Sequence, residues 1–260
     1  MGRSSSRSPA PALHWRISLH ADAVAPMTDQ RSRTPVLAQR QFAARRHEFN
    51  GLDLAARFAL IHRTNLWGAN ASLSGVGSEL AATTRLRHEL PVLLRSLGVR
   101  TLLDLPCGDF GWMAHTALGD IRYLGADIVP EIVAANTAAH GRSGQVDFVT
   151  RDLVSDPLPT ADLILCRDCL VHLSFDHIGR ALANMQRSGA RWLLTTTFLE
   201  LTDNRDIDDG DWRPLNFMRP PFHFPPPEAV LIEGCTEADG DYADKALALW
   251  QLAALPTALV

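Results

Sequence analysis

Acidic side chains follow three successive apolar runs of the sequence. Asp104, Asp127 and Asp152 each stand at or just after the end of such a run. Asp127 follows Gly108 by about 20 residues, the spacing at which an acid accepts hydrogen bonds from ribose hydroxyls, while Asp152 suits the exocyclic amine of a purine. Carboxylates also cap helix N-termini, but their repetition at three strand ends favours a ligand site.

A histidine and a further aspartate come just after the fourth apolar run, 161–166. His172 lies in the segment CLVHLS, and Asp168 precedes it by four residues. Imidazole titrates near neutral pH and suits a general base. The alternative is a histidine that bonds a loop carbonyl or packs beside a ligand. We expect His172 and Asp168 to be catalytic.

Short apolar runs alternate with stretches of helical length from Val99 onward, and this alternation predicts the elements that position these side chains. Parallel strands need crossover connections, so the pattern indicates a doubly wound α/β fold with a seven-stranded, mostly parallel sheet. The last run is a candidate for an antiparallel edge strand. The predicted strands are 99–105, 121–127, 146–150, 161–166, 191–198, 229–235 and 245–255, and the helices between them are 111–119, 130–141 and 175–189.

The rest of the chain predicts a basic, disordered tail over 1–34, a helical cap over 35–98 and a catalytic domain over 99–260 with an irregular insertion at 199–228. The composition of the tail also fits a transit peptide. Within the cap, helical spacing of apolar residues indicates two helices in 36–63, interrupted near Asn50-Gly51. A further helical run, 78–97, contains Pro91, which should kink or divide it.

Composition excludes several classes of function. The 260 residues carry a formal net charge of −4, which gives little of the positive field that binds nucleic acid. No apolar run reaches the roughly 18 to 20 residues of a membrane span. Four cysteines and the lack of a secretory signal favour the cytoplasm. A monomer and a homodimer both remain open, and no function is drawn from the single lysine, Lys245.

The string DLPCGDFGWM, with RDCLVHLS, TTTF and DWRPLNF after it, resembles class I S-adenosylmethionine-dependent methyltransferases, in a subgroup with a DLPCGD-type loop. Pro106 and Phe110 stand at two of the family's usual glycine positions. The resemblance implies a Rossmann-like fold and S-adenosyl-L-methionine as cofactor. It places the cofactor on Asp104, Pro106, Gly108, Asp109, Trp112, Asp127, Ile128, Asp152, Leu153 and Arg167.

The charge of the glycine turn also separates two cofactor classes. Asp109 would repel the pyrophosphate that a dinucleotide brings to such a turn. A sulfonium cofactor has no phosphate, and Asp104 or Asp109 can pair with its ammonium group. The acidic turn therefore favours S-adenosylmethionine.

The insertion supplies candidate contacts for the methyl acceptor. Trp212, Arg213, Asn216 and His223 suit a polyhydroxylated molecule, although a lid held by Arg–Asp pairs is an equal alternative. Asp168, Asp203 and Asn204 resemble the magnesium ligands of catechol-type O-methyltransferases, and oxygen ligands suit Mg²⁺. We expect O-methylation of a sugar or natural-product hydroxyl. N- or carboxyl-methylation, or a non-catalytic S-adenosylmethionine-binding module, are the alternatives.

Overall fold

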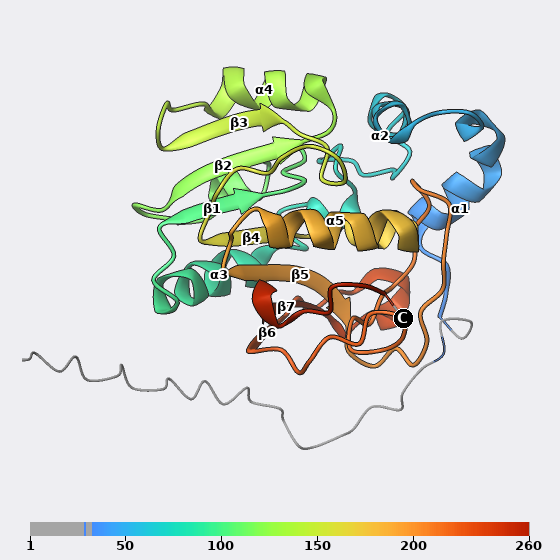
Figure 1. The fold of residues 1–260 in the computed structure, drawn as a ribbon. Helices are drawn as coiled ribbons and strands as arrows, with labels where there is room; N and C mark the ends of the chain where they lie inside the picture. The colour runs from blue at the N-terminus through green and yellow to red at the C-terminus, as the bar shows by residue number, and fades with distance from the viewer. Residues whose placement is uncertain (1–28, 30–32, 260) are drawn as a thin grey trace, which may run out of the picture.

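A computed structural model describes residue 29 and residues 33–259, so most of the predicted 1–34 tail, and with it the predicted disorder, lies outside the described residues. The described chain forms one seven-stranded sheet in the order β3-β2-β1-β4-β5-β7-β6 (Figure 1). The strands are β1 (Thr101–Asp104), β2 (Arg122–Asp127), β3 (Val146–Thr150), β4 (Leu163–Cys166), β5 (Trp192–Phe198), β6 (Ala229–Ile232) and β7 (Lys245–Gln251).

The predicted α/β class and all seven strands are confirmed. Strands β1 to β5 pair in parallel, so their carboxyl ends meet at one edge of the sheet. The last strand, β7, is antiparallel as expected, but it lies between β5 and β6. The expectation of an edge position for β7 is therefore wrong, because β6 pairs on its outer side.

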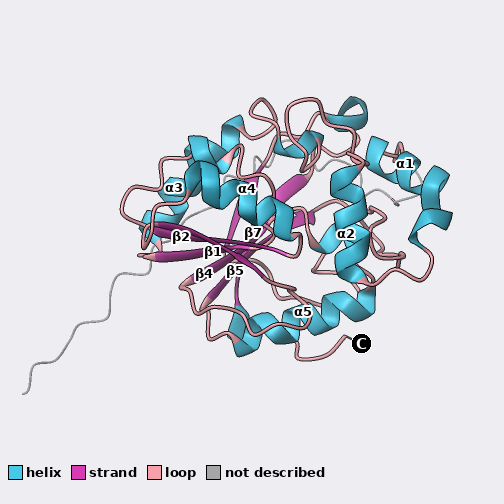
Figure 2. Ribbon diagram, turned by 90° about the horizontal axis from the view of Figure 1, so that it is seen from above, coloured by secondary structure: helices cyan, strands magenta, loops and turns pink. Residues whose placement is uncertain are grey.

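Helices cover both faces of the sheet (Figure 2). α5 (Phe175–Arg187) lies on one face, and α3 (Thr84–Ser96) and α4 (Pro130–His140) lie on the other. Side chains of a strand alternate between faces. Leu103 accordingly joins the core beneath α5, while Leu102 joins the core beneath α3.

The N-terminal helices match the predicted pattern in part. α1 (Leu37–Arg45) continues into a 3₁₀ turn, Arg46–Phe49, and α2 (Leu54–Arg63) follows after the predicted interruption. Pro91 does not divide the third run, because α3 continues through it. Leu86, Leu90 and Leu94 of α3 are buried against the sheet, and this packing offsets the backbone hydrogen bond that proline cannot donate.

One predicted helix is wrong. The segment 111–119 forms only a 3₁₀ turn at Met113–His115. Trp112 and Met113, which are adjacent in the sequence, both pack into the core, and this packing does not require a helix. The segment 199–228 contains no named helix or strand. Within the described part of the chain, no helix is long and apolar enough to cross a membrane.

Candidate functional site

A cleft opens at the carboxyl ends of β1, β2 and β4. This is where ligands bind in open α/β sheets. All ten residues predicted for the cofactor line it: Asp104, Pro106, Gly108, Asp109, Trp112, Asp127, Ile128, Asp152, Leu153 and Arg167. The predicted catalytic residues Asp168 and His172 line it as well.

Asp104 is a buried carboxyl group at the end of β1. The hydroxyl of Tyr123 donates to its Oδ2 at 2.7 Å, and among the described residues no cation forms an ion pair with it. Burial raises the pKa of Asp104 to about 7, against the lowering effect of the Tyr123 hydrogen bond. A positively charged ligand group would restore its ionised form.

Asp127 ends β2 and shapes the turn that follows β1. The Gly108 N–H donates to its Oδ2 at 3.1 Å, and the Val129 N–H donates to its Oδ1 at 3.0 Å. Each oxygen keeps a second lone pair for a ligand hydroxyl. Burial raises the pKa of Asp127 to about 6, although these backbone hydrogen bonds lower it.

Gly108 allows the chain to turn close to a neighbouring loop. Its φ is +53°, and a Cβ there would lie 2.3 Å from the Ser74 hydroxyl oxygen. Only glycine fits both the left-handed backbone and this contact. The turn therefore presents backbone, without a side chain, to the cleft.

Asp109 and Asp152 make structural hydrogen bonds in addition to lining the cleft. Asp109 Oδ2 accepts from the Ser72 hydroxyl at 2.7 Å and from the Leu73 N–H at 3.0 Å. Asp152 accepts from the Val154 N–H at 2.8 Å and from the Ser155 hydroxyl at 2.6 Å. Both carboxylates are thus partly occupied by protein donors, whereas Asp104 accepts a side-chain hydrogen bond from Tyr123 alone among the described residues.

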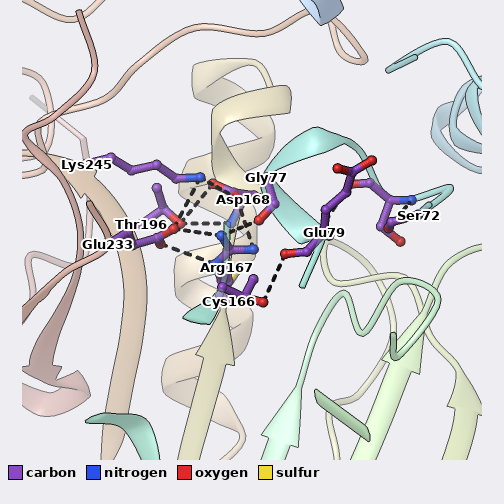
Figure 3. Close-up of polar contacts among 12 residues, drawn as sticks. Ser72, Gly77, Glu79, Cys166, Arg167, Asp168, Thr196, Glu233 and Lys245 are labelled. Carbon is purple, nitrogen blue, oxygen red and sulfur yellow. Dashed lines mark hydrogen bonds and ion pairs between the residues drawn. The ribbon is translucent and has the colours of Figure 1, made fainter. Parts of the chain in front are cut away.

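A network of buried charges holds Asp168 (Figure 3). Lys245 Nζ lies 2.7 Å from Asp168 Oδ2, and Arg167 Nη1 lies 3.3 Å from the same atom. Thr196 Oγ1 accepts the Asp168 N–H at 2.8 Å. Although burial alone would raise the pKa of Asp168, Lys245 and Arg167 hold it well below its ordinary value. Asp168 is therefore an ionised, fixed carboxylate.

Arg167 is the second member of this network. It pairs with Glu233 at 2.6 Å and donates to the Gly77 carbonyl at 2.8 Å. Its guanidinium carbon lies 5.5 Å from the centre of the Trp112 ring. With its donors committed to protein groups, Arg167 shapes the cleft wall.

His172 is buried, with one ring nitrogen bonded and the other available. Its Nδ1 lies 2.8 Å from the Asp211 carbonyl oxygen. A carbonyl can only accept, so Nδ1 carries the proton and Nε2 keeps a lone pair. Burial lowers the pKa of His172 to about 4, and Trp67 stacks on the ring at 4.5 Å between centroids. A neutral, oriented imidazole is suited to accept a proton at Nε2.

A second, smaller cavity meets the cleft at four residues. Trp67, Ser74, Asp168 and His172 line both spaces. The remaining wall of the second cavity consists of Val36, Leu37, Ala38, Gly75, Val76, Gly77, Phe198, Trp212, Cys235, Glu237, Tyr242 and Lys245. A molecule in the cleft and another in this cavity would meet beside His172.

Of the four acceptor contacts predicted in the insertion, Trp212 lines the second cavity, and the other three line neither this cavity nor the cleft. Arg213 is fully buried, and its guanidinium donates to the carbonyls of Leu170 and Leu173 at 2.9 and 2.6 Å. In this structure Arg213 therefore has a structural role. Burial lowers the pKa of Arg213 to about 9.

Asn216 and His223 also lie outside both cavities. The Asn216 amide donates to the carbonyls of Leu199 and Leu201, which fixes the insertion to itself. His223 is exposed, and its backbone N–H donates to the Arg219 carbonyl. The structure therefore does not bring Asn216 and His223 to either cavity, and the irregular segment offers no periodicity that would show which of its side chains face inward.

Each of the predicted magnesium ligands is bonded to protein groups. The Asp168 carboxylate pairs with Lys245 and Arg167, and Asp203 pairs with Arg205 at 3.3 Å. Asn204 donates to the Asn216 and Pro220 carbonyls. No group of three or more His, Cys, Asp or Glu side chains in the described ranges could hold a metal ion. The structure therefore gives no support to Asp168, Asp203 and Asn204 as a magnesium site.

Several site residues were missing from the sequence prediction. The sequence could have drawn attention to Lys245, because it is the only lysine of the chain and it begins a predicted strand. Glu233 lies within the predicted strand 229–235, Glu237 comes two residues after it, and β6 ends at the same edge of the sheet as β5. Trp67 and Ser74 lie in a stretch without periodicity, so nothing in the sequence indicated their position.

No family model matches the sequence, and neither does any curated protein sequence. Among solved structures, human N-acetylserotonin methyltransferase in complex with S-adenosylmethionine is 17% identical, with 83% of this chain and 66% of that chain covered and a TM-score of 0.48. Magnesium protoporphyrin IX methyltransferase from Synechocystis PCC 6803, with bound S-adenosylhomocysteine, is 16% identical, with 60% and 71% covered and a TM-score of 0.41.

An amino pentose methyltransferase from Micromonospora echinaspora, with bound S-adenosylmethionine, is 20% identical, with 42% of this chain and 48% of that chain covered and a TM-score of 0.36. The activities belong to those proteins. The fold of this chain, a Rossmann-like α/β sheet of seven strands with one antiparallel member, is established by its own strand order and register.

Proposed function

We propose that this chain is an S-adenosylmethionine-dependent methyltransferase that methylates a hydroxyl group of a small molecule. The observation that carries the proposal is the junction of two cavities at a neutral, oriented histidine, with Trp67, Ser74 and Asp168 beside it. The cleft would take the cofactor, and the second cavity, called here the acceptor cavity, would take the methyl acceptor.

The charge of the cleft supports a cationic cofactor. Its lining carries the carboxyl groups of Asp104, Asp109, Asp127, Asp152 and Asp168 against only two guanidinium groups, Arg151 and Arg167. This excess of negative charge favours a sulfonium and an ammonium over a diphosphate. Asp104 would hold the ammonium, Asp127 would hold the ribose hydroxyls, and Gly108 would let the cofactor lie against backbone.

The residues at the junction would align the acceptor and remove its proton. When bound, S-adenosylmethionine supplies an electrophilic methyl group. Trp67 and the Asp211 carbonyl fix the His172 ring, so Nε2 accepts the hydroxyl proton without reorienting. The negative charge of Asp168 favours the protonated His172 ring and thus stabilises the imidazolium as it forms.

The substitution His172→Ala tests the proposed base. Turnover should fall at least about 100-fold, the usual contribution of a general base. Affinity for S-adenosylhomocysteine, measured by calorimetric titration, should stay within about twofold, because the Nε2 proton acceptor is not needed for cofactor binding. A variant with unchanged turnover would remove His172 from the mechanism.

The substitution Asp127→Ala tests the cofactor site. Loss of the carboxylate removes the ribose acceptor and two hydrogen bonds that hold the turn, so affinity for S-adenosylhomocysteine should fall at least about tenfold. Asp147→Ala, in β3, is the control and should bind normally. Tight binding of NAD by the unmodified protein, with no binding of S-adenosylhomocysteine, would contradict the proposed function.

A further inference from the structure

The acceptor cavity lies against a cluster of five charged side chains. Asp168, Glu233 and Glu237 are acidic, while Arg167 and Lys245 are basic. Arg167 forms a two-point ion pair with Glu233, through contacts of 2.6 and 3.2 Å. Lys245 lies 2.7 Å from Asp168 and 3.5 Å from Glu233. The two basic groups thus compensate Asp168 and Glu233, and Glu237 is a third acid without a cation of its own in the cluster.

Glu237 lines the acceptor cavity and has no committed partner. Among the described residues, no hydrogen bond or ion pair reaches its carboxylate. Burial raises the pKa of Glu237, and Lys245 acts on it electrostatically in the opposite direction. Lys245 itself is bonded to Asp168. A Cβ on Gly77 would lie 3.6 Å from Glu237 Oε1 and 3.3 Å from Lys245 Nζ. Gly77 therefore lies directly over this cluster, with no side chain covering it.

The walls around Glu237 are aromatic. Trp67, Phe198, Trp212 and Tyr242 line the cavity. The Trp212 and Tyr242 rings meet edge to face at 5.2 Å, and Phe198 contacts both. Aromatic faces attract an ammonium group and also pack against an apolar body. A cavity that combines a carboxylate with such rings is suited to bind a cationic amine.

An anionic acceptor fits this cavity poorly. Among the described residues, Lys245 is the only Lys or Arg that lines it, and that ammonium group is bonded to Asp168 and Glu233. An acceptor carboxylate or phosphate would have to displace one of these two partners and leave its charge uncompensated. The same group would also approach Glu237 and Asp168, whose negative charges repel it.

We infer that the methyl acceptor is a small hydroxylated amine whose ammonium group pairs with Glu237 while its hydroxyl faces His172. This inference rests on the proposed methyl transfer. In that step the acceptor oxygen bonds to the methyl carbon, the bond from that carbon to sulfur breaks with its electron pair left on sulfur, and the hydroxyl proton passes to His172 Nε2. The ammonium group has no lone pair and is not methylated.

Two matched sets of probes test the charge preference. The first set is tyramine, 4-(2-hydroxyethyl)phenol and 4-hydroxyphenylacetate; the second is 4-aminocyclohexanol, 1,4-cyclohexanediol and 4-hydroxycyclohexanecarboxylate. Each set holds the body and hydroxyl constant while the other group is cationic, neutral or anionic. Binding is measured by calorimetry on the full chain saturated with S-adenosylhomocysteine, and product by mass spectrometry with S-adenosylmethionine.

In at least one set, the amine should bind at least about tenfold more tightly than its neutral counterpart, and the anion should bind most weakly. Glu237→Gln should remove most of that preference while changing the neutral compound's affinity less than twofold. Glu228→Gln is the control, because Glu228 is exposed and bonds Gln251 outside the cavity. It should keep the preference.

The inference is overturned if the neutral or anionic members bind most tightly, if neither amine binds, or if Glu237→Gln retains the preference. Methylation on nitrogen instead of oxygen would also overturn it. Affinity for S-adenosylhomocysteine distinguishes a failure of this inference from a failure of the proposed function. If the unmodified protein and Glu237→Gln both bind that compound, a lost preference concerns the acceptor alone; if neither binds it, the proposed function fails first.

Discussion

Asp104 shows how one residue can favour binding at the expense of stability. It is buried at the end of β1, and its only side-chain hydrogen bond among the described residues comes from Tyr123. The pKa of Asp104 is about 7 in the folded protein and about 3.9 in an unfolded chain. A raised pKa means that the folded state binds the proton more tightly, so stability falls as pH rises from about 4 through about 7.

We therefore predict that Asp104→Asn stabilises the ligand-free protein at pH 8 and weakens cofactor binding. The pKa difference corresponds to roughly 4 kcal/mol, fully expressed above pH 7. Urea unfolding at pH 4.5 and pH 8 checks this: the free energies of unfolding of the two proteins should differ far more at pH 8. An equal difference at both pH values would show that the ionisation of Asp104 does not govern stability.

At the residue scale, strand-end side chains were predictable from sequence and loop side chains were not. Asp104, Asp127 and Asp152 follow apolar runs, and the end of a parallel strand fixes where the next residue lies. Arg213 and Asn216 belong to a segment whose own carbonyl groups, those of Arg205 and Leu201, accept hydrogen bonds from them. Which polar side chain bonds the backbone groups of a loop depends on the path of that loop. Residue types and spacing do not predict this path.

At the element scale, the antiparallel direction of β7 completes the site. β7 runs opposite to β5, and its first residue, Lys245, pairs with Phe198 at the last position of β5. The start of β7 therefore lies at the same edge as the ends of the parallel strands. The sequence predicted this strand and its direction, but its place between β5 and β6 depends on pairing that periodicity does not encode.

The segment 33–38 forms a strap over the acceptor cavity, anchored to the residues just before β7. Arg33 makes a buried two-point ion pair with Asp244 at 2.7 and 2.9 Å, and the Tyr242 hydroxyl donates to the Thr34 carbonyl at 2.9 Å. Val36, Leu37 and Ala38 of this segment line the cavity. The strap contributes nothing to the lining of the cofactor cleft.

We predict that Arg33→Ala loosens the strap without harming the cofactor site. Removing one partner of a buried ion pair leaves Asp244 uncompensated, so amide hydrogen exchange of 34–40 should become at least about tenfold faster. Affinity for S-adenosylhomocysteine should change less than twofold. Arg40→Ala, at an exposed position of α1, is the control. Unchanged exchange in Arg33→Ala would show that other contacts hold the strap.

At the scale of the whole molecule, the strand order gathers acidic groups from distant parts of the chain into one cleft. β1, β2 and β4 are neighbours through crossovers, and each contributes a carboxylate at or after its last residue: Asp104, Asp127 and Asp168. The alternation of runs predicted this gathering, because parallel strands share one edge for their carboxyl ends. Five aspartates and two arginines of the chain thus line the cleft where a cationic ligand would bind.

This concentration predicts that cofactor binding depends on pH. Burial holds the pKa of Asp104 at about 7 and that of Asp127 at about 6 in the ligand-free protein. A ligand with an ammonium group and ribose hydroxyls prefers both carboxylates ionised, so affinity for S-adenosylhomocysteine should rise as pH increases from 5.5 to 8. Below pH 6, each carboxylate that must lose its proton lowers affinity by up to about tenfold per pH unit.

Calorimetric titration in phosphate and in Tris gives the number of protons released, because the two buffers differ in ionisation enthalpy. Near pH 6.5 the unmodified protein should release close to one proton on binding. Asp104→Asn should release fewer, since Asp127 alone still titrates, and its affinity should depend less steeply on pH. An affinity that stays constant from pH 5.5 to 8, with no proton released, would mean that the carboxylates are already ionised without ligand, and that burial does not protonate them.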